Sequence, residues 1–286
     1  MSKIVFLNGE YMDESEAKVS VFDRGFLFGD GVYEVVPVVN STILDREPFL
    51  ERLERSLSEI ELAWPIEKNK FLTMIDELIK RNDIKEGGVY MQVTRGVAPR
   101  EFFYPENTPT TVMAFAFSKS IINNPQAQTG LKVVTVKDIR WKRRDVKSIA
   151  LLGQCMAKEE AHRAGAYEGW MVEDGFVTEG TSSSAYIVKD GKIITRPLSN
   201  SILPGIRRKL LIELANEHNI EIVERLFTVE EAYDADEAFL SSATTFVLPI
   251  VEIDGKKIGS GKPGPLFEKM RKMYIESALK IAGVSL

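Results

Sequence analysis

The sequence predicts an α+β protein made of two domains, and three observations lead to this prediction. The chain has 286 residues, more than the roughly 100 to 200 residues of a usual single domain. Short apolar runs of strand length recur along it, and several are joined by Asn-Gly or Asp-Gly turns, which are strong signals for antiparallel hairpins. Other segments place apolar residues at helical spacing. This mixture predicts mostly antiparallel strands packed with helices.

The first domain is expected to span residues 1–118. It opens with a hairpin, because Asn8-Gly9 separates two short strand-like runs. Pro37 within a later apolar run favours an edge, a bulge or a strand end. The expected elements are strands at residues 3–7, 10–12, 32–39, 89–95 and 110–117, and helices at residues 49–62 and 68–81. Turn-forming and aromatic residues before the last strand predict a long loop.

A linker is expected at residues 119–130, because this polar stretch contains a proline and shows no helical or strand period. The second domain then spans residues 131–286. Asp174-Gly175 and Asp190-Gly191 each separate two strand-like runs and predict hairpins. The expected elements are strands at residues 131–136, 168–173, 176–178, 184–189, 192–195, 221–224, 237–241 and 247–253, and helices at residues 149–164, 206–217 and 265–282.

Composition argues against several classes of function. The formal net charge is -5, whereas nucleic-acid binding needs a clustered basic surface, so no nucleic-acid partner is expected. One short basic run, residues 142–144, could be a solvated turn or the rim of an anion site. Cys155 is the only cysteine, and His162 and His218 are the only histidines. Neither a disulfide within the chain nor a metal site is therefore expected.

The same survey gives an expected location. No stretch approaches the roughly 20 apolar residues of a membrane span, so no membrane partner is expected. The apolar stretch near the start is too short for a secretory signal. With its single cysteine, the chain is expected in the reducing cytoplasm.

Four segments carry residues suited to acid–base chemistry or to phosphate binding. Lys147 lies where strand signals give way to a helix, so a rigid element could present its amine into a cleft. Taken alone, one lysine among 37 lysines and arginines is expected to be solvated. Residues 179–184, 202–207 and 241–245 combine glycine or hydroxyl side chains with backbone N–H groups near element ends. Each could hold an anion, and each is equally consistent with a plain turn.

Together, the segments of this chain resemble one family. Their order and spacing are similar to those of fold-type IV pyridoxal 5'-phosphate (PLP) enzymes, and the similarity to D-amino-acid aminotransferases is close. The segments are RGFLFGDGVYEV, ERL, QVTRGVAPR, RRDVKS, VTEGTSSSAY, ILPGIR and SSATTFVLPIVEIDG. The resemblance covers nearly the whole chain. It implies a smaller N-terminal α/β domain, a larger C-terminal domain of mostly antiparallel strands, and a PLP cleft between them.

The resemblance also implies a role for each matching residue. Lys147 corresponds to the lysine that forms a Schiff base with PLP and moves the substrate proton. Glu179 corresponds to the acid that keeps the pyridine nitrogen protonated, and Arg52 to the arginine on the cofactor phosphate. Ser182 would support the ring face, and backbone N–H groups would bind the phosphate. The implied cofactor-binding residues are Arg52, Lys147, Glu179, Ser182, Leu203, Ile206, Arg207 and Ala243.

The substrate site departs from the family pattern. The resemblance implies that Tyr33, Arg100 and Thr244 bind the substrate, and that Arg100 reaches the carboxylate from the partner subunit of a homodimer. Phe49 and Phe102 stand where well-known members have histidines, so a carboxylate donor is missing. Arg95 or Arg207 could replace it, and the sequence leaves this choice open.

The activity implied by the resemblance is transamination of a D-amino acid, with D-alanine and 2-oxoglutarate giving pyruvate and D-glutamate. A branched-chain L-amino-acid or (R)-amine aminotransferase would use Lys147, Glu179 and Arg52 equally well. Branched-chain enzymes usually carry a glycine and an arginine where this chain has VVPV at residues 35–38, which disfavours the first of these. An aminodeoxychorismate lyase shares the fold but needs no 2-oxo acid. A catalytically silent homologue would lack the lysine or the acid, and both are present.

Overall fold

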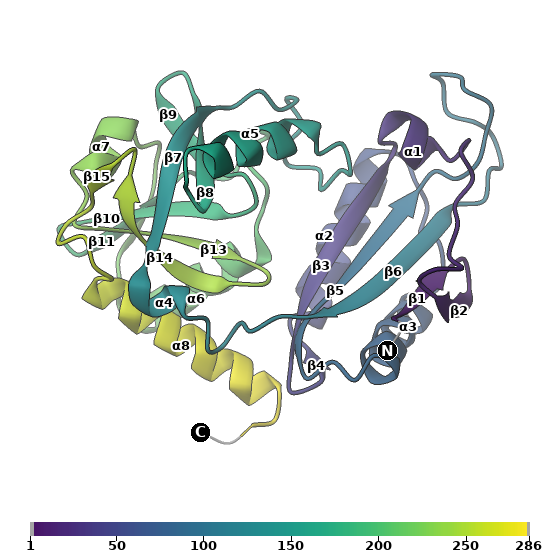
Figure 1. Cartoon of the computed structure of the whole chain (residues 1–286), viewed down its shortest axis with the longest axis horizontal. Helices are drawn as coiled ribbons and strands as arrows, with labels where there is room; N and C mark the ends of the chain where they lie inside the picture. The colour runs from purple at the N-terminus through teal and green to yellow at the C-terminus, as the bar shows by residue number, and fades with distance from the viewer. Residues whose placement is uncertain (1–2, 285–286) are drawn as a thin grey trace. The chain divides into compact units, whose positions relative to one another are not determined.

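The computed structural model describes residues 3–284. Contacts between residues divide the described chain into two compact units. The first contains residues 3–120, 146–150 and 279–284, and the second contains residues 121–145 and 151–278. Figure 1 shows both units, coloured along the chain. Lys147 thus belongs to the first unit, although the sequence on either side of residues 146–150 belongs to the second.

The first unit is built on a six-stranded antiparallel sheet with the strand order β2-β1-β6-β5-β3-β4. Helix α2 packs against β3, and helix α3 packs against β1, β5 and β6 (Figure 1). The elements are β1 (Ile4–Leu7), β2 (Glu10–Asp13), α1 (Arg24–Phe28), β3 (Gly31–Val39), β4 (Thr42–Ile43), α2 (Arg46–Glu59), α3 (Lys68–Arg81), β5 (Glu86–Thr94) and β6 (Thr111–Ser118).

Alternating side chains explain the core of this unit. Val32 and Val36 of β3 are buried, because side chains two residues apart point to the same face of a strand. Helix α3 buries an apolar stripe at helical spacing. The stripe consists of Phe71, Met74, Ile75, Leu78 and Ile79. The neighbouring strands β3 and β5 pair without a bulge from Gly31 to Val39, so a continuous hydrogen-bond ladder fixes the positions of the β3 side chains.

The second unit contains a nine-stranded sheet. Eight of its strands follow the order β12-β11-β10-β13-β14-β7-β8-β9, and β15 pairs with β14. The pairs β11–β12, β14–β7 and β7–β8 are parallel, and the others are antiparallel. The elements are α4 (Gln126–Thr129), β7 (Leu131–Lys137), α5 (Leu152–Arg163), β8 (Glu168–Glu173), β9 (Phe176–Gly180), β10 (Ser184–Lys189), β11 (Lys192–Thr195), α6 (Ile206–Glu217), β12 (Ile222–Glu224), α7 (Val229–Tyr233), β13 (Glu237–Ser242), β14 (Phe246–Ile253), β15 (Lys256–Lys257) and α8 (Pro265–Ile281).

Aromatic residues fill much of the second core. Trp170 and Phe227 are fully buried and meet edge to face, with centroids 6.0 Å apart. Helix α5 packs against β7 and β8, and α6 packs against β12 and β13. Both sheets are therefore mostly antiparallel and accompanied by helices, which confirms the predicted α+β class. Within residues 3–284, no helix is long and apolar enough to cross a membrane.

Three local features differ from the sequence-based expectation. Residues 24–28 form the short helix α1, because Asp23 caps it by accepting a hydrogen bond from the Gly25 N–H at 2.8 Å. Helix α5 begins at Leu152 rather than near residue 149, since the residues before it pair with β3. The segment expected as a linker contains the short helix α4.

Candidate active site

The backbone of Lys147 is anchored to β3 and α2 in the first unit. The Lys147 carbonyl accepts a hydrogen bond from the Tyr33 N–H at 3.0 Å, and its N–H donates to Ser56 Oγ at 3.3 Å. The Ile149 N–H extends this pairing by donating to the Gly31 carbonyl at 3.1 Å. A lysine between two packed elements starts from a rigid backbone, which is what a reactive amine needs.

The amine of Lys147 lies near the ring of Tyr33. Its Nζ atom is 4.1 Å from the Tyr33 ring centroid. The Tyr33 ring stacks on Tyr90 at 5.6 Å between centroids, and Tyr90 stacks on Phe115 at 5.0 Å. Burial raises the pKa of Tyr90 to about 12, so its hydroxyl is neutral at ordinary pH. The structure thus brings together two of the predicted site residues, one catalytic and one substrate-binding.

Arg52 forms a bidentate ion pair with Glu34. Arg52 Nε lies 2.8 Å from Glu34 Oε1, and Nη2 lies 2.7 Å from Oε2. Glu34 follows Tyr33 in β3, so its side chain points to the opposite face of the sheet, where it is completely buried. A bidentate carboxylate fixes the plane of a guanidinium. The arginine predicted to bind phosphate is therefore held in one orientation by a residue that the sequence did not single out.

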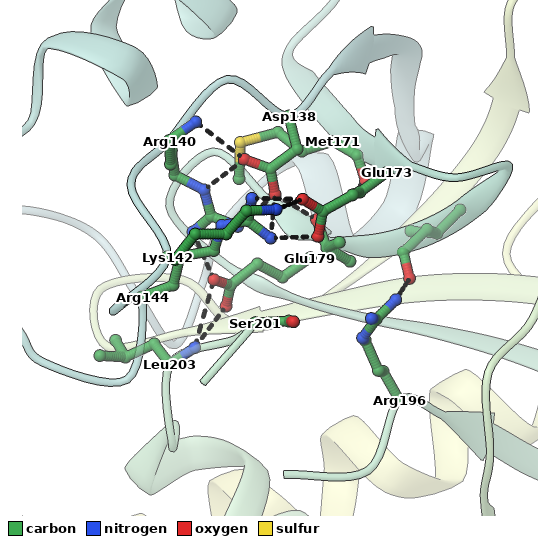
Figure 2. Close-up of polar contacts among 12 residues, drawn as sticks. Asp138, Arg140, Lys142, Arg144, Met171, Glu173, Glu179, Arg196, Ser201 and Leu203 are labelled. Atoms are coloured by element: carbon green, nitrogen blue, oxygen red, sulfur yellow. Dashed lines mark hydrogen bonds and ion pairs between the residues drawn. The ribbon is translucent and has the colours of Figure 1, made fainter. Parts of the chain in front are cut away.

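Glu179 lies at the centre of a polar cluster in the second unit (Figure 2). Its carboxylate accepts a hydrogen bond from Arg140 Nη1 at 2.5 Å. The backbone N–H of Leu203 donates to both carboxylate oxygens, each at 3.2 Å. Two residues predicted to bind the cofactor, Glu179 and Leu203, thus lie in direct contact.

The cluster continues to a second buried carboxylate, Asp138, as Figure 2 shows. Arg140 Nε and Nη2 donate to its two oxygens at 3.0 and 2.7 Å. Arg144 lies 3.4 Å from Asp138 and forms two hydrogen bonds with Glu173, at 2.8 and 3.0 Å. Lys142 donates to Glu173 at 2.5 Å. Arg140 thus serves two buried carboxylates, and Arg144 adds a second positive charge beside Asp138.

Burial and ion pairing shift the pKa values of these groups in different directions. Burial raises the pKa of Glu179, against the opposing effects of Arg140 and the Leu203 N–H. Burial also acts to raise the pKa of Asp138, but the hydrogen bonds and charge of Arg140 outweigh it and the pKa is lowered. Arg144 and Lys142 hold the pKa of Glu173 at about 2. A cation near Glu179 would favour its ionised form.

The hydroxyl groups of the turn after Glu179 donate hydrogen bonds to another carboxylate, Glu168. Ser182 Oγ donates to Glu168 Oε2 at 3.2 Å, and Ser183 Oγ donates to the same atom at 3.3 Å. Thr181 Oγ1 and Lys158 contact Glu168 Oε1. Because Glu168 is 1% exposed, these donors satisfy a buried charge. The Ser182 hydroxyl therefore ties this turn to Glu168.

The predicted phosphate-binding segments lie at element ends in the second unit. Helix α6 begins at Ile206, its N-cap is Gly205, and no side chain caps it. The N–H groups of Ile206 and Arg207 lie in the first turn of this helix, where an anion is favoured. Ala243 and Thr244 occupy the turn between β13 and β14.

The two arginines considered as replacement carboxylate donors are engaged elsewhere. Arg95 donates to Asp30 at 2.9 Å and to the Ile60 carbonyl at 2.6 Å, and it stacks on Tyr104 at 3.5 Å. Arg207 donates to the Tyr274 hydroxyl at 2.8 Å, and both residues are buried. Phe49 is completely buried, so it acts as a core residue of α2.

Sequence reasoning missed three residues that hold the predicted ones. Arg140 contacts Glu179, Glu34 contacts Arg52, and Glu168 contacts Ser182. Each is a charged residue with low exposure, and its partner is 14 to 39 positions away in the chain. The acid in the strand sequence YEVV was the one available signal, because a charge within an apolar run needs a buried partner.

Comparisons with known proteins identify the family of this chain. The family model "Amino-transferase class IV" matches residues 31–253. A D-alanine aminotransferase of Staphylococcus haemolyticus is 42% identical over 279 residues, covering 96% of this chain and 98% of the relative. A D-alanine aminotransferase of Bacillus licheniformis is 39% identical over 277 residues, covering 96% of this chain and 97% of the relative.

Solved structures share the fold. A branched-chain aminotransferase of Thermoproteus uzoniensis matches with a TM-score of 0.88 at 27% sequence identity. The match covers 99% of this chain and 96% of that protein's chain. A branched-chain amino acid aminotransferase of Escherichia coli has a TM-score of 0.87 at 24% identity, covering 96% and 94% of the two chains. The resemblance found in the sequence is confirmed. The chain belongs to the class IV aminotransferases.

Proposed function

We propose that this enzyme transfers the amino group of D-alanine to a 2-oxo acid such as 2-oxoglutarate, giving pyruvate and D-glutamate. The observation that carries this proposal is the sequence identity of about 40% to D-alanine aminotransferases over 96% of the chain. The branched-chain enzymes share the fold at identities of 24 to 27%, which supports them less as functional relatives.

The donors described above fit PLP as the cofactor. Lys147 offers an amine to an aldehyde, Glu179 a buried carboxylate to a pyridine nitrogen, and Arg52 a fixed guanidinium to a phosphate. The first-turn N–H groups of α6 and the turn at Ala243 would add phosphate donors. When bound, PLP withdraws electrons from the substrate α-carbon.

The chain's own residues then have separate tasks. Lys147 takes and returns the proton of the α-carbon, starting from a backbone that β3 and α2 hold in place. Glu179 would offer its carboxylate to the pyridine nitrogen of the bound cofactor, and Arg140 fixes the direction of that carboxylate. Tyr33 and Thr244 are the further residues that would bind the substrate. Leu203 and Ser182 support the carboxylate and the turn next to it.

Arg100 is proposed to bind the substrate carboxylate from the partner subunit of a homodimer. It lies in a loop that exposes large apolar side chains, with Phe102 78% and Phe103 71% exposed, and such a patch is typical of an interface. Losing a charge-assisted carboxylate contact costs about 2 to 4 kcal/mol, or about 30-fold to 1000-fold in kcat/KM. Arg100→Ala should therefore cripple D-alanine turnover and largely spare a carboxylate-free (R)-amine. Equal losses on both substrates would contradict this role.

We also propose a cytoplasmic location, which is expected from the single cysteine.

One labelling experiment tests the assignment of the catalytic lysine. Borohydride reduction of the holoenzyme, followed by peptide mapping, should place the cofactor on Lys147, and Lys147→Ala should abolish transamination. Lys70→Ala is the matched control, because Lys70 is 74% exposed. A label on another lysine would contradict the assignment.

A coupled assay tests the substrate. D-alanine with 2-oxoglutarate should be turned over far faster than L-valine with the same acceptor. A preference for L-valine would indicate a branched-chain enzyme instead. Consumption of an amino substrate without any 2-oxo acid would indicate a lyase.

A further inference from the structure

The loop that carries Arg100 is tied to α1 at its base. The Arg24 N–H donates to the Gly96 carbonyl at 2.8 Å, and the Ala98 N–H donates to the Phe22 carbonyl at 3.3 Å. Gly96 has a φ of 89°, and a Cβ at this position would clash with the carbonyl of Pro109. The two ends of the loop therefore pass each other at a point where only glycine fits.

A buried arginine, Arg24, reaches from α1 to the middle of this loop. Arg24 is only 3% exposed to solvent. Its Nε donates to Asp30 Oδ2 at 2.7 Å, and its Nη1 donates to the carbonyl of Glu101 at 2.6 Å. The peptide bond that follows Glu101 is thus held one residue away from Arg100. A guanidinium can do this because its donors point in two directions from one rigid plane.

Asp30 joins this contact to a second one farther along the loop. Its Oδ2 also accepts from Arg95 Nε at 2.9 Å, and the Arg95 guanidinium lies 3.5 Å from the ring centroid of Tyr104. Arg24 and Arg95 share one carboxylate, and each touches the loop at a different point. The loop is therefore held at two points that follow Arg100 in the sequence, Glu101 and Tyr104.

Arg100 itself lies beside an aromatic pair. Its guanidinium carbon is 5.4 Å from the centroid of Phe28 and 5.6 Å from that of Phe102, and the two rings are 5.5 Å apart. Arg24 lies 4.8 Å from the same Phe28 ring. Both routes from Arg24, through the Glu101 carbonyl and through Phe28, lead to Arg100. Phe102, which replaces a histidine donor, contributes a ring contact in its place.

We propose that Arg24 is a positioning residue that holds Arg100 for the substrate carboxylate, acting through the Glu101 carbonyl and the Phe28 ring. The inference rests on the proposed role of Arg100. In this chain a single arginine then binds the carboxylate without the second donor, because its loop is already ordered before substrate arrives. Arg24 touches neither substrate nor cofactor in this role.

The test compares Arg24→Lys with the wild-type holoenzyme. A lysine keeps the charge but cannot donate to Asp30 and the Glu101 carbonyl in one plane. The KM for D-alanine should rise about tenfold, equivalent to about 1.4 kcal/mol, while kcat stays within about twofold. Hydrogen exchange of the amides of residues 97–104 should become faster. Arg46→Lys is the matched control, because Arg46 also pairs with an aspartate but its side chain is 42% exposed. Phe28→Leu, which leaves the charges intact, replaces Arg24→Lys should that variant fail to fold, and should raise KM in the same direction.

A double-mutant cycle separates positioning from a general structural role. If Arg24 acts through Arg100, adding Arg24→Lys to Arg100→Ala should change kcat/KM by less than about twofold. A further tenfold loss would overturn the inference. An unchanged KM in Arg24→Lys, with Arg100→Ala impaired, would overturn it and leave the proposed role of Arg100 standing. An unimpaired Arg100→Ala would overturn both.

Discussion

Replacing Arg140 by methionine removes the guanidinium that Glu179 and Asp138 share. Arg140 donates to Glu179 at 2.5 Å and to the two oxygens of Asp138 at 3.0 and 2.7 Å. Methionine has a similar length and no charge, so the change leaves both carboxylates in place without their main partner. Their side chains are 8% and 0% exposed, respectively. Water therefore cannot replace the lost donors without a rearrangement.

Removing one partner of a buried ion pair destabilises a protein by about 3 to 5 kcal/mol. Here the Leu203 N–H still donates to Glu179, and Thr178 Oγ1 still donates to Asp138 at 2.7 Å. We therefore expect the lower end, a loss of about 3 kcal/mol in the free energy of unfolding. The loss should shrink as pH falls. Without Arg140, the pKa of Asp138 is no longer held low, so this carboxyl can take up a proton and lose its unpaired charge.

Urea unfolding of the cofactor-free protein, followed by circular dichroism, measures this loss. Arg163→Met is the control, because Arg163 is 78% exposed and pairs with Glu159 one helical turn away; its cost should stay below about 1 kcal/mol. Adding Glu179→Gln to Arg140→Met should recover part of the stability, since one unpaired charge disappears. A loss for Arg140→Met no larger than that of Arg163→Met would refute the reasoning.

Three further perturbations have expected outcomes. Glu173→Gln should lower the free energy of unfolding at pH 7 by about 1.5 to 3 kcal/mol. Because the pKa of Glu173 is lowered from 4.5 to about 2, the difference in stability from wild type should fade as the pH falls from 4.5 to about 2. A difference that does not change with pH would contradict this pKa. Gly96→Ala should destabilise the protein by about 1 to 3 kcal/mol in thermal unfolding, because an alanine meets both a φ of 89° and the Pro109 carbonyl; an unchanged melting temperature would count against the described loop base. Glu179→Gln should reduce turnover more than PLP affinity, and Arg52→Ala should reduce PLP affinity more than turnover; titration of PLP and steady-state kinetics check this division, and equal effects of both changes would contradict it.

Local turn chemistry made much of the fold predictable. The hairpins at Asp174-Gly175 and Asp190-Gly191 form where expected, and all four residues have positive φ, from 50° to 82°. Such conformations depend on the residue itself and its nearest neighbours. The start of α5 was wrong by about three residues because residues 147–149 pair with β3, more than 100 positions earlier in the chain. No local pattern contains that information.

The candidate site was also predictable only in part from the sequence. The order of motifs in the sequence was sufficient to name Lys147, Glu179 and Arg52 and to infer the family, because reactive groups are recognised by residue type and spacing. Which charges hold those groups could not be read from spacing. Arg140 meets Glu179 across 39 positions, and Arg24 meets the Glu101 carbonyl across 77.

The sequence by itself determined the class of fold, the turns and the family, and it predicted which residues would react. Only the tertiary structure decided that Arg95 and Arg207 are engaged elsewhere, and that Glu34 and Arg140 orient the groups predicted to hold the cofactor. The physical reason is that periodicity and turn preference act over a few residues. An ion pair or hydrogen bond instead depends on distance and burial, and folding sets both between residues far apart in the chain.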